Sequence, residues 1–202
     1  MSAALSQVPA STRQNHLAGR LQPGQVYRRE DLTDWTASVD RDLQRLVRQG
    51  TLHKLAQGLY YAPKPSPFGI VPPTDETLVT SFLRDKDFLI FSPNVYNTLG
   101  VGTTQLYNTT WVYNHKRHGT FKLGNRTFDF RSKSKFPHTL TPEFLLIDLL
   151  NNLDTLAEER DTLLRQVREC SADMEVDQLQ SALDAYGSVA TRKRMRTWGL
   201  YD

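Results

Sequence analysis

Three arginines share one face of the segment from residue 36 to residue 49, and their chemistry is that of anion binding. On a helix of 3.6 residues per turn, Arg41, Arg45 and Arg48 point in similar directions. Guanidinium groups bind phosphate oxygens and the guanine edge exposed in the DNA major groove. The same face carries three further small or amide side chains, Ala37, Ser38 and Gln44. The segment therefore fits a helix that enters the major groove.

The opposite face of this segment is apolar and predicts a helix packed on a core. Val39, Leu43, Leu46 and Val47 recur at helical spacing, and Gly50 is a suitable C-terminal stop. The flanks carry two acidic residues, Asp40 and Asp42. An ordinary solvated charged face is the alternative for any isolated amphipathic helix.

The elements around this helix favour DNA binding. A short helix is expected at Arg29–Asp34, and two short strands follow at Thr51–Leu55 and Leu59–Ala62, joined by a turn that contains Gly58. The order helix, helix, hairpin is typical of a winged helix-turn-helix domain, whose hairpin turn reaches phosphates or the minor groove. The predicted DNA contacts are Arg28, Thr36, Ser38, Arg41, Gln44, Arg45, Arg48, Lys54 and Gln57.

Five of the ten prolines fall between residues 63 and 73, which predicts an extended linker. The expected fold class is α+β: a winged helix-turn-helix domain at 1–62, the linker at 63–73, and a mixed α/β domain with a helical C-terminal tail at 74–202. Each part has its own apolar periodicity, so each is expected to fold alone. The second part should contain capped helices after Thr74 and Thr141, a strand at Phe88–Phe91 and a hairpin around residues 124–125.

The charge is unevenly distributed along the chain. Net charge is +3 over residues 1–62, +5 over residues 63–140 and -5 over residues 141–202. A basic first two thirds favours a polyanionic partner. A secondary basic patch is predicted at Lys116, Arg117, Arg192, Lys193, Arg194 and Arg196. The part around Lys116 and Arg117 could extend a DNA footprint, contact an acidic protein or a tRNA-like ligand, or be a solvated basic surface, and these alternatives stay open. The role of the C-terminal basic residues also stays open.

Several function classes are excluded by the sequence. The single cysteine, Cys170, allows no internal disulfide or cysteine zinc site, and no long apolar run or signal-peptide pattern occurs, so a soluble cytoplasmic protein without a membrane partner is expected. His115 and His118 lack a third metal ligand. Asp129 and Lys133 lack the further carboxylate that metal-dependent nucleases need. We expect no cofactor and no enzymatic activity.

Six segments in the two parts of the chain carry a likeness to a known family. They are Pro23–Leu32, Ser38–Gly50, Gly58–Pro63, Thr74–Glu76, Phe91–Gly100 and Thr141–Asp148. These segments resemble the AbiEi-type antitoxins, which are transcriptional regulators of type IV toxin-antitoxin systems. The likeness covers roughly residues 20 to 155, while the hydrophilic tail after Asn152 departs from it.

The resemblance implies two tasks. One is repression of the protein's own operon through double-stranded DNA with inverted repeats, with self-association on DNA as an open point. The other is neutralisation of a nucleotidyltransferase toxin encoded next to it. Two alternatives remain: a winged-helix regulator unrelated to toxin-antitoxin systems, and a protein-interaction adaptor that uses the winged helix as a scaffold.

Overall fold

The computed structural model describes residues 17–101, 106–156 and 159–200. The protein has an α+β fold that divides into two compact units. The first comprises the chain up to Lys86 together with Lys122–Arg126, and the second comprises Asp87–Phe121 and the chain from Thr127 onward. The first sixteen residues of the predicted domain 1–62 lie outside the described residues.

The first unit contains a three-stranded antiparallel sheet in the order β1-β3-β2. Its strands are β1 (Val26–Arg28), β2 (His53–Ala56) and β3 (Leu59–Tyr61). The β2–β3 hairpin confirms the strands predicted from the sequence. Gly58 lies in its turn with φ of +70°, a conformation that glycine adopts without strain.

Helix α2 (Val39–Arg48) packs its apolar stripe into the core of the first unit. Val39, Leu43 and Leu46 are buried, as the sequence predicts. The helix begins at Val39 instead of near residue 36, because Thr36 has an extended backbone. The segment before it, η1 (Glu30–Trp35), is a 3-10 helix instead of the expected α-helix.

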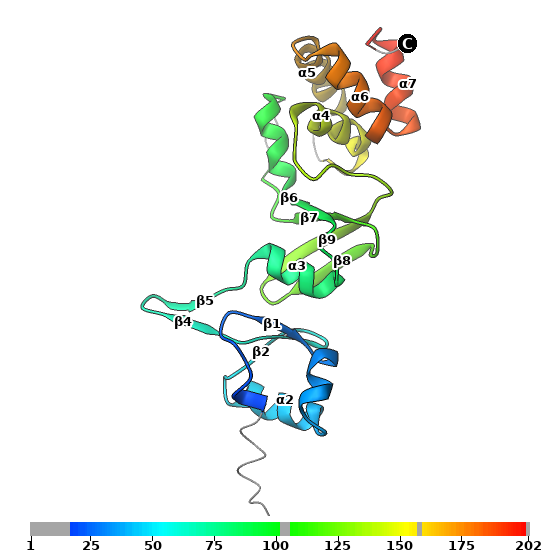
Figure 1. The fold of residues 1–202 in the computed structure, drawn as a ribbon. Helices are drawn as coiled ribbons and strands as arrows, with labels where there is room; N and C mark the ends of the chain where they lie inside the picture. Colours follow the sequence, from blue (N-terminus) through cyan, green and yellow to red (C-terminus); the bar gives the residue numbers. More distant parts are fainter. Residues whose placement is uncertain (1–16, 102–105, 157–158, 201–202) are drawn as a thin grey trace, which may run out of the picture. The chain divides into compact units, whose positions relative to one another are not determined.

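The proline-rich segment forms paired strands where the sequence predicts an extended linker. Strands β4 (Lys64–Ser66) and β5 (Gly69–Val71) make an antiparallel hairpin, drawn as a narrow arm in Figure 1. Extended backbone imposed by proline also suits a strand at a sheet edge, where a missing N–H is tolerated. Helix α3 (Asp75–Leu83) follows within the same unit, so the compact units do not coincide with the predicted boundaries.

The second unit is built on a four-stranded sheet in the order β6-β7-β9-β8. Strands β6 and β7 are antiparallel, whereas β7 and β9 are parallel. The turn of the β8–β9 hairpin, at residues 124–125, is where the sequence predicts it, although Lys122–Arg126 group with the first unit. The strands are β6 (Phe88–Phe91), β7 (Thr110–Asn114), β8 (Gly119–Leu123) and β9 (Arg126–Ser132).

Helices complete the second unit, and α4 lies at the centre of its core. Every residue from Phe144 to Leu150 is buried. Figure 1 shows α5, α6 and α7 gathered around α4. The helices of the second unit are η2 (Pro93–Leu99), α4 (Pro142–Asn151), η3 (Leu153–Thr155), α5 (Arg160–Ala172), α6 (Val176–Tyr186) and α7 (Val189–Thr197).

Side chains begin α3 and α4 in the way the sequence predicts. The Thr74 hydroxyl accepts a hydrogen bond from the Thr77 N–H, and the Thr141 hydroxyl accepts one from the Phe144 N–H. Within the described ranges, none of these helices is both long and apolar enough to cross a membrane.

Candidate nucleic-acid interface

The solvent side of α2 presents Arg41, Gln44 and Arg48, which we call the α2 outer face. All three side chains are exposed, and none has a hydrogen-bond or ion-pair partner among the residues that the structure describes. Two guanidinium groups and one amide can therefore bind an external acceptor without first breaking an internal contact. This is the donor set that reads guanine and adenine edges and binds phosphate.

The acidic residue nearest to this face is neutralised by a neighbour. Arg29 makes a two-pronged contact with Asp40, from Nε to Oδ1 at 2.6 Å and from Nη2 to Oδ2 at 2.7 Å. The hydrogen bond to Arg29 lowers the pKa of Asp40, and the same hydrogen bond raises the pKa of Arg29. Asp40 therefore stays ionised but paired, which weakens its repulsion of a nearby phosphate.

The second acidic residue holds the start of α2 together. Asp42 accepts hydrogen bonds from the Thr36 hydroxyl at 2.6 Å and from Arg45 Nη2 at 3.2 Å. The Thr36 hydroxyl in turn accepts one from the Ser38 N–H at 3.2 Å. Thr36 and Arg45 thus stabilise the helix start, while the partly exposed Ser38 precedes its first turn.

The β2–β3 hairpin carries two further predicted contacts, Lys54 in strand β2 and Gln57 in the turn. Lys54 and Gln57 are both exposed, and Lys54 Nζ donates a hydrogen bond to Gln57 Oε1 at 3.2 Å. The strand register shifts between Lys54 and Ala56. An exposed ammonium on a hairpin that follows α2 is suited to the phosphate backbone.

Arg28 is used inside the first unit instead. Its Nη1 donates to the carbonyl oxygens of Ser81 at 3.1 Å and Phe82 at 3.0 Å, in the last turn of α3. A cation suits the carbonyl end of a helix. The structure thus separates Arg28 from the α2 outer face and makes it a link between β1 and α3.

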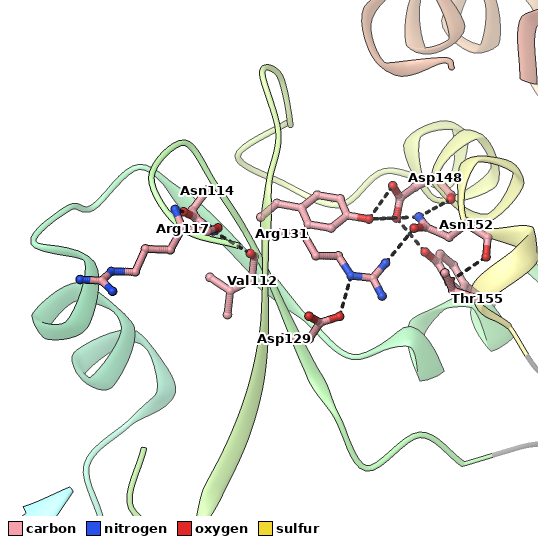
Figure 2. Close-up of polar contacts among 10 residues, drawn as sticks. Val112, Asn114, Arg117, Asp129, Arg131, Asp148, Asn152 and Thr155 are labelled. Atoms are coloured by element: carbon pink, nitrogen blue, oxygen red, sulfur yellow. Dashed lines mark hydrogen bonds and ion pairs between the residues drawn. The ribbon is translucent and has the colours of Figure 1, made fainter. Parts of the chain in front are cut away.

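The predicted secondary basic patch is divided among several local environments. Lys116 and Arg117 are exposed on the loop after β7, where the buried Asn114 amide accepts their backbone N–H groups at 2.8 and 2.7 Å (Figure 2). Arg192 Nη2 donates to the Asp184 carbonyl oxygen at 2.9 Å, near the end of α6. Partial burial lowers the pKa of Arg194. On α7, Lys193 and Arg196 remain exposed.

The sequence interpretation missed a buried polar cluster in the second unit, here called the Asp148 network (Figure 2). Asp148 is 2% exposed and accepts hydrogen bonds from the Tyr96 hydroxyl at 2.7 Å and the Tyr113 hydroxyl at 2.8 Å. Asn152 Nδ2 donates to the Tyr113 oxygen at 3.1 Å, and Arg131 Nη1 donates to Asn152 Oδ1 at 2.7 Å. One acidic residue inside a run of apolar residues was the available signal.

Burial dominates the electrostatics of the Asp148 network. Desolvation raises the pKa of Asp148, although the two tyrosine hydrogen bonds oppose that rise. Desolvation and the Asp148 charge raise the pKa of both Tyr96 and Tyr113. The tyrosines are therefore hydrogen-bond donors at neutral pH. Four elements, η2, β7, β9 and α4, meet at this network.

Two residues considered for metal or nuclease chemistry, His115 and Asp129, have other partners. Arg131 Nε donates to Asp129 Oδ2 at 2.8 Å, and the Arg131 guanidinium lies 3.4 Å from the centre of the Trp111 ring. His115 Nδ1 lies 2.8 Å from the Lys133 carbonyl oxygen. In the described part of the chain, no three histidine, cysteine or acidic side chains gather in a way that could hold a metal ion.

Comparisons with known proteins identify a family and a similar fold. No curated protein matches the chain. Among solved structures, the crystal structure of the RV2827C protein from Mycobacterium tuberculosis is similar, with a TM-score of 0.53 and 16% sequence identity, over 95% of this chain and 77% of that one. At this identity the likeness concerns the fold alone. The model of a family of unknown function, DUF6088, matches residues 19–157, and the chain therefore belongs to that family.

Proposed function

We propose that this protein is a sequence-specific, double-stranded DNA-binding transcriptional regulator whose first unit works as a winged helix-turn-helix. In this proposal η1 and α2 form the helix-turn-helix and the β2–β3 hairpin is the wing. The observation that carries the proposal is the α2 outer face: Arg41, Gln44 and Arg48 are exposed and unpaired within the described residues, opposite a buried apolar stripe.

We assign each proposed DNA contact to a base edge or to phosphate by its position on the proposed interface. Arg41 lies in the first turn of α2, the part of a recognition helix that usually contacts base edges, and Gln44 lies about one turn later on the same face. Arg48 lies in the last turn and is assigned to phosphate, as are Lys54 and Gln57 on the hairpin. An operator with inverted repeats would then bind two copies of the chain, one on each half-site.

Binding to the protein's own promoter should depend steeply on salt. Each phosphate contact releases condensed counterions, so the logarithm of the affinity should fall linearly with the logarithm of the salt concentration, by a slope of about 0.9 per contact. Fluorescence anisotropy with labelled upstream DNA measures this slope. Absence of binding to every promoter fragment at low salt would refute the proposal, and binding indifferent to salt would favour the adaptor alternative.

Replacing Lys54 with alanine should weaken binding to cognate and random DNA about equally. Loss of one phosphate contact should also reduce the salt slope by about 1. The matched control is Lys64→Ala, which removes the same charge from an exposed site on β4 outside the proposed interface. Equal losses of DNA affinity in the two variants would show that the overall charge of the protein, and not the position of Lys54, determines the affinity.

The resemblance to AbiEi-type antitoxins extends the proposal to a second task. We propose that the protein also neutralises a nucleotidyltransferase toxin encoded beside it, without a cofactor or catalytic activity of its own. Co-expression with that neighbour, followed by counting of surviving cells, tests the second task. Failure of the full chain to rescue growth, together with intact promoter binding, would favour a winged-helix regulator unrelated to toxin-antitoxin systems.

A further inference from the structure

The first unit contains a cavity of about 450 Å³ beside the β2–β3 hairpin. It lies among β2, the β5 end of the arm, α3 and the Lys122–Arg126 segment. Its walls are mainly apolar and include Leu55, Tyr61, Ile70, Leu78 and Leu123. The volume falls in the range of small-molecule sites, which are apolar clefts with a few polar groups that orient the ligand.

The ionisable groups that line this cavity are basic, apart from the Tyr61 hydroxyl. His53, Lys54 and Arg126 line it together with the Asn125 amide, and no acidic residue is among its lining residues. Asp75 forms an ion pair with Arg126 Nη1 and so fixes the position of that guanidinium. An apolar interior beside two basic side chains, one of which is already paired with Asp75, is complementary to a molecule with an apolar body and an anionic group.

Hydrogen bonds hold the cavity walls in place. The Gly124 N–H donates to the Leu55 carbonyl oxygen at 2.8 Å, and the Tyr61 hydroxyl donates to the Val71 carbonyl oxygen. Gly124 has φ of +64°, and a Cβ there would lie 3.1 Å from Leu55 Cδ2. These contacts fix the positions of the cavity walls, so little ordering cost would oppose binding.

We propose that this cavity is a binding site for a small amphipathic anion, with an aromatic or aliphatic body against the apolar walls and a carboxylate at Lys54 and Arg126. The site goes beyond the proposed DNA-binding function and does not depend on it.

A suitable probe is 1-naphthoate, titrated into the full chain by isothermal calorimetry, with the neutral 1-naphthalenemethanol as the charge control. We expect saturable binding of 1-naphthoate and weaker binding of the alcohol. Lys54→Gln should raise the Kd for 1-naphthoate about two- to fivefold, the scale of a partly exposed ion pair. It should leave the Kd for the alcohol unchanged.

Ile70→Trp tests the location of the site. Ile70 is 53% exposed and lines the cavity, so the indole should fill its mouth without disturbing the core and raise the Kd at least about tenfold. The matched control is Val71→Trp, because Val71 is 40% exposed and does not line the cavity. Absence of 1-naphthoate binding, equal binding of the alcohol, or an unchanged Kd in Ile70→Trp would each overturn the assignment.

The site also borders the proposed DNA contact, because Lys54 belongs to both. An occupant that engages the Lys54 ammonium competes with phosphate, so saturating 1-naphthoate should raise the Kd for promoter DNA about two- to fivefold. This coupling rests on the proposed function and should vanish in Lys54→Gln. An unchanged Kd in the wild type would contradict the coupling. A chain that binds 1-naphthoate but no DNA would contradict the proposed function and support the cavity assignment.

Discussion

Replacing Asp148 with alanine is expected to lower the free energy of unfolding by about 3–5 kcal/mol, the usual cost of removing one partner from a buried charged network. The hydroxyls of Tyr96 and Tyr113 would lose their shared acceptor inside the core, and an unsatisfied buried donor carries its full desolvation penalty. Guanidinium denaturation followed by tryptophan fluorescence measures the change, since Trp111 lies in the same core. The matched control is Asp154→Ala, whose side chain is 85% exposed and should contribute less than about 1 kcal/mol.

The Asp148→Asn variant tests whether burial sets the behaviour of this carboxyl. Burial raises the pKa of Asp148 in the folded state, so between its ordinary value near 3.8 and that raised pKa the folded protein holds more protons than the unfolded chain. Wild-type stability therefore falls as pH rises through this window, while the contribution of asparagine does not change. The stability deficit of Asp148→Asn relative to wild type should shrink above about pH 4. A deficit that grows with pH would contradict the raised pKa.

The second large effect is expected on DNA binding. Removing Arg41 and Arg48 together should weaken promoter binding by about 2–5 kcal/mol, because one is assigned to a base edge and the other to phosphate. In anisotropy titrations this corresponds to roughly 30- to 5000-fold in Kd. Arg41→Ala alone should cost about 1–3 kcal/mol and relax sequence preference at one position.

The matched control for the double variant lies on α5 of the second unit. Arg165→Ala with Arg168→Ala removes the same charge from exposed positions three residues apart. A comparable loss of affinity in the control would show that net charge, not the α2 outer face, determines binding. Leu43→Ala should instead destabilise the first unit, because Leu43 is 1% exposed.

The helices named here could be predicted because apolar periodicity and capping residues, which are local features of the sequence, were sufficient for them. The helical stripe of Val39, Leu43 and Leu46 and the threonine caps of α3 and α4 are confirmed. The sequence predicts that α2 starts near residue 36, whereas it starts at Val39. The prediction did not include the side-chain hydrogen bond from the Thr36 hydroxyl to Asp42, which lies at the start of the helix. The DNA contacts assigned from the sequence remain predictions, although the structure shows that Arg28 faces α3.

Two features could not be derived because they depend on partners distant in the sequence. A proline-rich segment has an extended backbone both in a linker and in an edge strand. The pairing of Pro65 with Ile70 shows that this segment is a strand, and that pairing cannot be derived from the proline content alone. Asp148 interrupts an otherwise apolar run in α4, but its hydrogen-bond donors come from residues 52 and 35 positions away. The sequence around Asp148 does not identify either donor.

The assignment of Lys122–Arg126 to the first unit has a consequence for how the protein is made. The chain passes between the units at residues 86–87, 121–122 and 126–127. During synthesis on the ribosome, the first unit is completed only after residue 126 has emerged, when residues 87–121 of the second are already present. A nascent chain halted near residue 86 lacks the segment that supplies Gly124 and Arg126. Completion of the first unit therefore depends on translation through residue 126, 40 residues beyond its first stretch of sequence.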